Sequence, residues 1–184
     1  DVYKRQFLSI VLLVIFNEIF FDNKTFGSSD NLSPKAVGLA LNEVMEKEGG
    51  YPHWQPWVFS GMPTAEAFTN LSQLYFPEYL FKIFSVPGMF IQISHFLFCG
   101  IGMVLLLRYL GCTYWSSLLG SIGFMITPYM VTMLVFGHGS QIMTAAYIPW
   151  IVMFTIKLWN DPKILNIGIL SVSYTHLTLP TILL

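Results

Sequence analysis

The sequence predicts an all-α fold, a polytopic bundle of transmembrane helices with a large extracytoplasmic loop after the first helix. Composition is the first reason, because 54% of the 184 residues are hydrophobic and only 10% are charged, whereas soluble domains carry about 25% charged residues. Several apolar runs are long enough to cross a bilayer. A polar, aromatic-rich stretch at residues 22–86 separates the first run from the others. These features indicate an integral membrane protein.

Five apolar segments are predicted to form the helices of this bundle, at residues 7–21, 87–110, 114–136, 142–159 and, in part, 164–171. The first is slightly shorter than the roughly 20 residues that a span needs, and we attribute this to a missing native start. Pro128 predicts a kink in the third segment. His95 lies inside the second, where a single histidine more often hydrogen-bonds between helices than serves as a ligand.

Both ends of the chain are expected to be foreign to the native protein. Residues 1–6 and 172–184 resemble translated adapter or assembly artefacts, so the domain is placed at residues 7–171. The alternative is that both ends are native, in which case residues 172–184 would pass as a weak strand. We keep these segments out of the fold argument and expect the native protein to continue beyond about Ser171.

The charges of the chain indicate its orientation and exclude one class of partner. A net charge of -1 argues against nucleic acid. Arg108, Lys157 and Lys163 flank short loops, so they are expected on the cytoplasmic side. That orientation places both the loop at residues 22–86 and the turn at residues 137–141 on the outer face. Membrane lipid is the first expected partner.

A helix is predicted inside the loop, from Ser33-Pro34 to Gly49-Gly50. Serine is a favoured N-cap, proline suits the first helical position and glycine commonly ends a helix. Apolar residues recur at helical spacing, at Val37, Leu41, Val44 and Met45. We expect this helix to lie on the membrane surface or to pack on its neighbours, with a solvated acidic face.

Residues 51–63 are predicted to be non-helical because three prolines interrupt them. This segment exposes aromatic side chains, among them Trp54 and Trp57. One interpretation is a wall for a lipid-linked substrate. The other is an interfacial anchor, a common role for tryptophan.

The order of motifs along the chain resembles the N-terminal part of the YfhO-like family of bacterial multi-pass membrane proteins. The motifs are Ser29-Asp30 after the first apolar run, Trp-x-Pro-x-x-Phe-x-Gly-Met-Pro at residues 54–63, Gly-His-x-Ser at residues 137–140, and Ala-Tyr-x-Pro at residues 146–149. The resemblance covers about residues 7–171, and family members are several times longer. Where the family often has a lysine after the serine of the turn, this chain has Gln141.

The resemblance implies a GT-C-type glycosyltransferase fragment in the bacterial inner (cytoplasmic) membrane. Such an enzyme moves a sugar from a polyprenyl-phosphate donor to an extracytoplasmic acceptor, so the polyprenyl-phosphate sugar is the second expected partner. The alternative is a non-enzymatic transporter or flippase of lipid-linked glycans. A transporter is expected to show internal repeats and paired broken helices.

The resemblance also implies that Asp30 is the catalytic residue, because GT-C enzymes place an acidic residue in the first outer loop. The reaction needs a base that deprotonates an acceptor hydroxyl while the lipid phosphate leaves, and a partly desolvated carboxylate at the membrane edge suits that task. The structural alternative for Asp30 is a capping or turn residue before Ser33. Glu18 and Asp22 are the runner-up acids, with interfacial solvation as their alternative.

The expected substrate-binding residues are His138, Ser140, Trp54, Trp57 and Gly61. His138 would contact the donor phosphate or support Asp30, and its alternative is a polar turn residue. The glycines on either side of it let backbone N–H groups approach an anion. GT-C relatives can use a divalent metal, but no cofactor is certain and no residue of this chain is assigned as a metal ligand.

Overall fold

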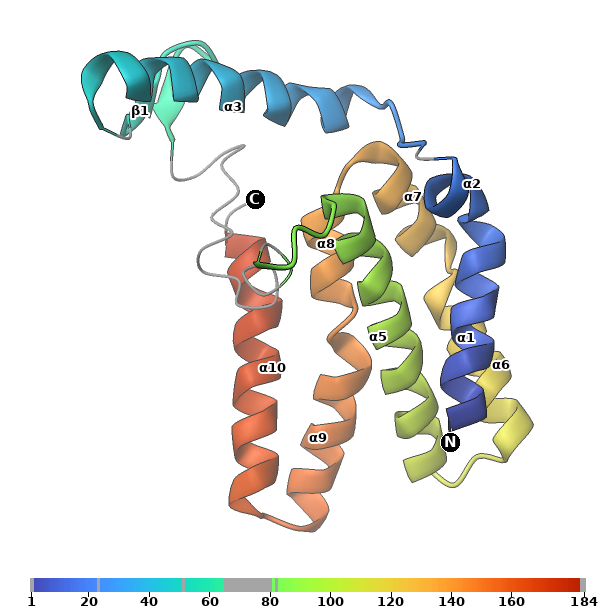
Figure 1. Cartoon of the computed structure of the whole chain (residues 1–184). Coiled ribbons are helices and arrows are strands. Elements are labelled where there is room, and N and C mark those ends of the chain that lie inside the picture. The colour runs from blue at the N-terminus through green and yellow to red at the C-terminus, as the bar shows by residue number, and fades with distance from the viewer. Residues whose placement is uncertain (1, 23, 51, 65–80, 82, 183–184) are drawn as a thin grey trace.

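The chain folds mostly into helices, with one short pair of strands (Figure 1). The computed structural model describes residues 2–22, 24–50, 52–64, 81 and 83–182. The elements are α1 (Val2–Ile15), α2 (Asn17–Phe21), α3 (Ser29–Glu48), β1 (Trp54–Gln55), β2 (Met62–Pro63), α5 (Gly88–Tyr109), α6 (Tyr114–Met125), α7 (Pro128–Phe136), α8 (Gly139–Ala145), α9 (Ile148–Asn160) and α10 (Ile164–Ile182).

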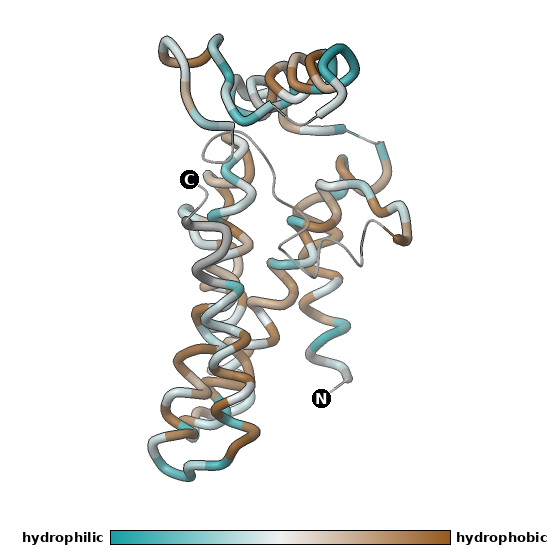
Figure 2. The backbone as a smooth tube through the Cα atoms, turned by 90° about the vertical axis from the view of Figure 1, so that its left-hand side faces the viewer, coloured by the Kyte–Doolittle hydropathy of each residue, from teal (hydrophilic) through white to brown (hydrophobic). Residues whose placement is uncertain are grey.

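Three of the apolar segments are long and apolar enough to cross a membrane: Gly88–Tyr109, Tyr114–Phe136 and Gly139–Asn160. They coincide with the predicted segments at residues 87–110, 114–136 and 142–159, and this part of the fold prediction is confirmed. The hydrophobic colours in Figure 2 follow these upright helices. The apolar part of α1, Arg5–Ile15, is shorter.

Residues 7–21 do not form one unbroken helix, so the prediction for this segment was wrong in that respect. α1 ends at Ile15 and α2 starts at Asn17, with Phe16 between them. The side-chain amide of Asn17 donates a hydrogen bond of 2.8 Å to the carbonyl oxygen of Val14. Asparagine side chains compete in this way with the helical backbone pattern, which accounts for the interruption.

Two of the three long segments are interrupted near a proline. Pro128 is the first residue of α7, and the backbone between α6 and α7 turns at Ile126 and Thr127. The predicted kink is therefore confirmed. Pro149 is the second residue of α9, which starts at Ile148 after the break at Ala146 and Tyr147, and proline has no N–H to donate to the preceding turn. The sequence had not predicted this second break.

α5 forms the centre of the helical group, where it contacts α1, α6, α8 and α9, while α10 packs on α8 and α9. The buried core includes Leu8, Phe96, Met125, Leu134 and Ile142. Polar side chains also join neighbouring helices. Ser121 donates to the carbonyl oxygen of Gly100 at 2.6 Å, and the Trp150 indole donates to that of Phe98 at 3.1 Å.

α3 crosses one end of these helices, as both Figure 1 and Figure 2 show. It ends at Gly49, whose φ of 74° is left-handed, as predicted. Its start at Ser29 corrects the predicted start at Ser33-Pro34, because the Ser28-Ser29-Asp30 run supplies an earlier N-terminus. Pro34 is accommodated within the helix, although it cannot donate the usual bond to the carbonyl of Asp30. Leu41 is buried, whereas Met45 is exposed and lies off the packed face.

The segment after α3 contains a small antiparallel pair, which the expected all-α fold did not include. β1 and β2 pair Trp54 with Pro63 and Gln55 with Met62. Phe59 and Ser60, in the connection, have φ values of 50° and 63°. With the bond from Gly61 N–H to Val58 O at 2.8 Å, they form a turn within the connection of the kind that needs positive φ at both central residues.

α10 starts at Ile164, where the fifth segment was expected, and continues through Ile182. The alternative of a weak strand at residues 172–184 is thus wrong for the residues described there. The foreign origin of residues 1–6 and 172–184 stays a prediction.

Candidate functional site

Asp30 and His138 lie beside one another at the end of the helical group that α3 crosses. The distance from Asp30 Oδ2 to His138 Nε2 is 3.6 Å. The proximity expected for these two residues is therefore present in the structure, although they are far apart in the chain.

Asp30 is placed by the start of α3. It lies in the first turn of this helix, where the unpaired N–H groups of the helix favour a negative charge. Phe26, just before the helix, packs against the main hydrophobic core and holds this end of α3 near α7, which α3 contacts. The helix start alone gives a sufficient structural reason for an aspartate here, so the position does not by itself require catalysis.

His138 is placed by the end of α7. Gly137 adopts a left-handed φ of 91°, its N–H donates to Leu134 O at 3.3 Å, and the N–H of His138 donates to Met133 O at 2.8 Å. This pattern is a Schellman motif, which needs glycine at the left-handed position. His138 is at the same time the N-cap residue of α8.

The predicted polar turn at residues 137–141 is shorter than expected. Only Gly137 and His138 lie outside the helices, because α8 starts at Gly139. Ser140 is half-buried in the first turn of α8, and no described contact joins it to Asp30.

The geometry of the pair is that of an accessible ion pair. A distance of 3.6 Å is too long for a hydrogen bond but permits attraction when the imidazole is protonated. The side chains are 53% and 39% exposed for Asp30 and His138. The partial desolvation expected for the catalytic carboxylate is therefore small in this structure.

Gln92 of α5 is a neighbour of this site that the sequence did not single out. A Cβ atom added to Gly139 would lie 2.1 Å from Gln92 Nε2, so the amide passes directly over the glycine that follows His138. A polar residue near the start of an apolar helix was the available signal. Gln92 places a hydrogen-bonding side chain against Gly139, the residue after His138.

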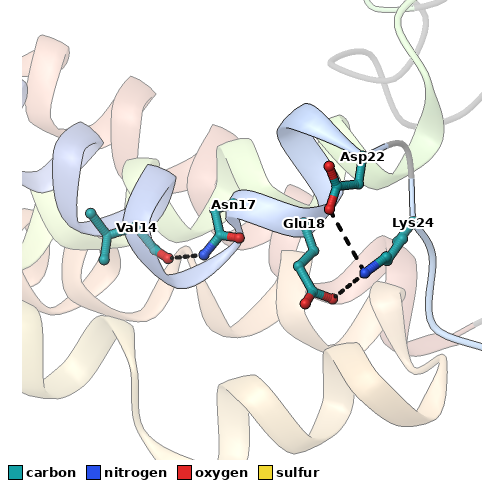
Figure 3. Close-up of polar contacts among 5 residues, drawn as sticks. All are labelled: Val14, Asn17, Glu18, Asp22 and Lys24. Carbon is teal, nitrogen blue, oxygen red and sulfur yellow. Dashed lines mark hydrogen bonds and ion pairs between the residues drawn. The ribbon is translucent and has the colours of Figure 1, made fainter.

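The runner-up acids occupy a different environment. Lys24 lies 3.3 Å from Glu18 and 3.7 Å from Asp22, and Figure 3 shows the two carboxylates converging on its ammonium group. All three side chains are more than half exposed. Glu18 and Asp22 therefore share one solvated cation.

The structure does not bring Trp54, Trp57 and Gly61 to Asp30, contrary to the idea that the aromatic loop forms a wall of the site. Asp30 is at the first turn of α3, whereas the hairpin follows the last turn (Figure 1). The 18 residues from Asp30 to the end of α3 span about 27 Å at 1.5 Å per residue. Both tryptophans are exposed, which agrees with the alternative of an interfacial anchor.

Gly61 has a structural role in the hairpin. Its φ is 114°, and an added Cβ would lie 2.7 Å from Cζ2 of Trp54. The indole ring of Trp54 therefore packs on the glycine backbone, which explains why a tryptophan and a glycine occur at this spacing.

The carboxylate at the described part of the candidate site is that of Asp30. Within the described ranges of the chain, no three His, Cys, Asp or Glu side chains gather as a metal site. Divalent cations such as Mg²⁺ and Ca²⁺ prefer several oxygen ligands, so the residues at Asp30 do not fit a metal and we derive no step through one.

The chain was also compared with known proteins. No protein-family model, curated protein or solved structure matches it.

Proposed function

We propose that this chain is part of a multi-pass bacterial inner-membrane glycosyltransferase of the YfhO-like, GT-C type. It would use a polyprenyl-phosphate sugar as donor and an extracytoplasmic acceptor. The observation that carries the proposal is the Asp30–His138 pair, 3.6 Å apart, at one end of the helices that are long and apolar enough to span a membrane. A carboxylate and an imidazole at that level could meet a substrate whose lipid tail remains in the bilayer.

The proposed reaction is a displacement at the anomeric carbon of the donor sugar. The acceptor oxygen forms a bond to that carbon, the bond from carbon to the phosphate oxygen breaks, and polyprenyl phosphate leaves with the electron pair. The proton of the acceptor hydroxyl goes to the carboxylate of Asp30, which acts as general base.

His138 would orient this base. When the imidazole of His138 is protonated, it attracts the carboxylate of Asp30. When the imidazole is neutral, the carboxylate can accept the proton of the acceptor hydroxyl. The half-exposed positions of both side chains leave room for an acceptor to approach. Gln92, which lies against Gly139, would limit the movement of the α8 start.

The function is tested by replacing Asp30 with asparagine in the full-length protein. A general base contributes about 10²- to 10⁴-fold in rate, so Asp30→Asn should reduce sugar transfer by that order with unchanged expression. The assay is sugar incorporation in membranes supplied with a polyprenyl-phosphate sugar. Asp22→Asn is the matched control, because Asp22 already pairs with Lys24, and it should retain activity. Full activity in Asp30→Asn would remove Asp30 as the base.

A transporter or flippase of lipid-linked glycans is the second candidate, and one observation favours it. Two neighbouring segments, α6–α7 and α8–α9, are both interrupted near a proline, and broken helices are typical of transporter binding sites. If the native protein moves a fluorescent polyprenyl-linked sugar across the membrane of proteoliposomes without consuming it, the transporter function replaces the enzymatic one.

The orientation is tested separately from the chemistry. We expect the residues near Thr64, Phe59 among them, to be extracytoplasmic and those near Asp161 to be cytoplasmic, because Arg108, Lys157 and Lys163 flank the loops of the other end. A cysteine introduced at Phe59, which is 81% exposed, should react with an impermeant thiol reagent on intact cells. A cysteine at Asp161 should react only after lysis, and the reverse pattern would invert the arrangement.

A further inference from the structure

A group of hydrogen-bond donors lies at the end of the helices opposite to Asp30. The ammonium group of Lys157 lies 5.4 Å from the ring centre of Tyr109 and 5.0 Å from that of Phe154. The side-chain amide of Asn160 donates to the hydroxyl oxygen of Tyr109 at 3.3 Å. These contacts join the last turns of α5 and α9, which pack together.

The positive charges at this end are only partly compensated. Lys163 is neutralised by Asp161, 2.6 Å away, and this hydrogen bond raises the pKa of Lys163. Lys157, by contrast, is half-buried and forms no ion pair with a carboxylate in the described part of the chain. Arg108, which is exposed, also forms no ion pair with a carboxylate among the described residues, and its Nη1 donates to Cys112 O at 2.8 Å. Two positive charges remain available to an anion.

The acceptor atoms on the α5 side of this group already have donors. The hydroxyl oxygen of Tyr109 accepts from Asn160, so the hydroxyl hydrogen of Tyr109 points away from the Asn160 amide. The last carbonyl groups of α5 are occupied by backbone donors: Leu106 O by Leu110, Leu107 O by Cys112 and Arg108 O by Gly111. Such capping reduces the negative potential that a helix C-terminus normally presents.

The level of this group along the helices points to a lipid as its ligand. Trp159 is 89% exposed and Trp115 is 75% exposed, and they lie at the same end as Lys157. Exposed tryptophans of this kind mark the headgroup level of a bilayer. Basic residues at that level attract anionic lipids.

We propose that Lys157, Tyr109 and Asn160 form a binding site for the phosphate of an anionic phospholipid headgroup, with Arg108 at its edge. The ammonium, hydroxyl and amide groups act as donors, and the aromatic rings beneath Lys157 limit its movement. The proposal is independent of sugar transfer. Its structural alternative is that Lys157 only stabilises the C-terminus of α9.

The test uses the full chain reconstituted in phosphatidylcholine bilayers that contain phosphatidylglycerol. One lipid class at a time carries brominated acyl chains, which quench nearby tryptophan fluorescence. The Trp159 signal is obtained by difference from the Trp159→Phe variant. A nearby basic residue favours an anionic lipid by about fivefold, and we expect that preference for phosphatidylglycerol around Trp159.

Lys157→Gln should abolish the preference, whereas Lys163→Gln is the matched control and should retain it, because Lys163 is already paired. Tyr109→Phe keeps the ring under Lys157 but removes the hydroxyl donor, and should reduce the preference by about twofold or more. If Lys157→Gln fails to fold, the Tyr109→Phe variant still tests the proposal. The proposal is overturned if the native chain shows no preference, if Lys157→Gln or Tyr109→Phe leaves it unchanged, or if Lys163→Gln loses it equally.

Discussion

Asp30 Oδ2 lies 3.6 Å from His138 Nε2, although the hairpin and the helices α5, α6 and α7 lie between the two residues in the chain. Two local devices produce this approach. The first turn of α3 carries the carboxylate, and the Schellman motif after α7 carries the imidazole. Each of these local structures depends on a few neighbouring residues. The proximity of Asp30 and His138 can therefore be tested without knowing the substrate.

The first prediction is that cysteines at positions 30 and 138 can be joined by a short thiol-specific bifunctional reagent in membranes. Cys112 is replaced by serine in this experiment, while Cys99 is buried and stays. The joined product should appear as an altered mobility after cleavage of the chain between the two positions.

The matched control places the first cysteine at Glu46, on the same helix and also exposed. Position 46 is 16 residues further along α3, about 24 Å at 1.5 Å per residue, so it should not be joined to position 138. Equal yields for the two pairs would contradict the placement of α3 over the α7–α8 junction.

The second prediction concerns the packing of α5 against α9. A Cβ atom at Gly102 would lie 2.4 Å from Trp150 Nε1, and the indole also donates to Phe98 O and stacks on the Phe98 ring at 4.9 Å. Since this rigid ring cannot move without losing both contacts, Gly102→Ala should lower the free energy of unfolding by about 1–3 kcal/mol. Thermal unfolding in detergent measures the change.

Gly123→Ala is the control for Gly102→Ala, because nothing lies within 4 Å of a Cβ at that helical position. It should be neutral or stabilising, as alanine favours a helix over glycine by about 1 kcal/mol. The double variant Gly102→Ala/Trp150→Phe should recover part of the loss. Similar Tm values for the two glycine variants would show that the helices do not approach closely here.

The long helices were predictable because their signal is carried by many residues. The apolar character of α5 is an average over its 22 residues, and Pro128 alone sufficed to predict the break before α7. The approach of His138 to Asp30 was expected from a resemblance and from the predicted orientation, not from spacing. The chemistry of that pair stays a prediction.

The features that the sequence did not reveal depend on few residues or on competing signals. Ser28 and Ser33 are both good N-cap residues, so local sequence signals do not distinguish a helix start at Ser29 from one at Ser33-Pro34. The strands β1 and β2 have two residues each, too few for an alternating pattern. The separation of Trp54 from Asp30 follows from the length and straightness of α3, which motif order along the chain does not contain.

The last prediction concerns the hairpin at the far end of α3. Gly61→Ala should disrupt it for two reasons: alanine is strained at a φ of 114°, and its Cβ would lie 2.7 Å from the Trp54 ring. The bonds that close the hairpin, from Thr64 Oγ1 to Pro52 O at 2.5 Å and from Thr64 N to His53 O at 3.1 Å, should weaken with it. Backbone strain of this kind costs on the order of 1–3 kcal/mol, which should increase amide hydrogen exchange in residues 52–64 by about 5- to 150-fold if the hairpin opens locally. Gly50→Ala is the matched control, because an added Cβ meets nothing within 4 Å there and its exchange should match the native chain. Unchanged exchange in Gly61→Ala would mean that Trp54 does not pack on Gly61.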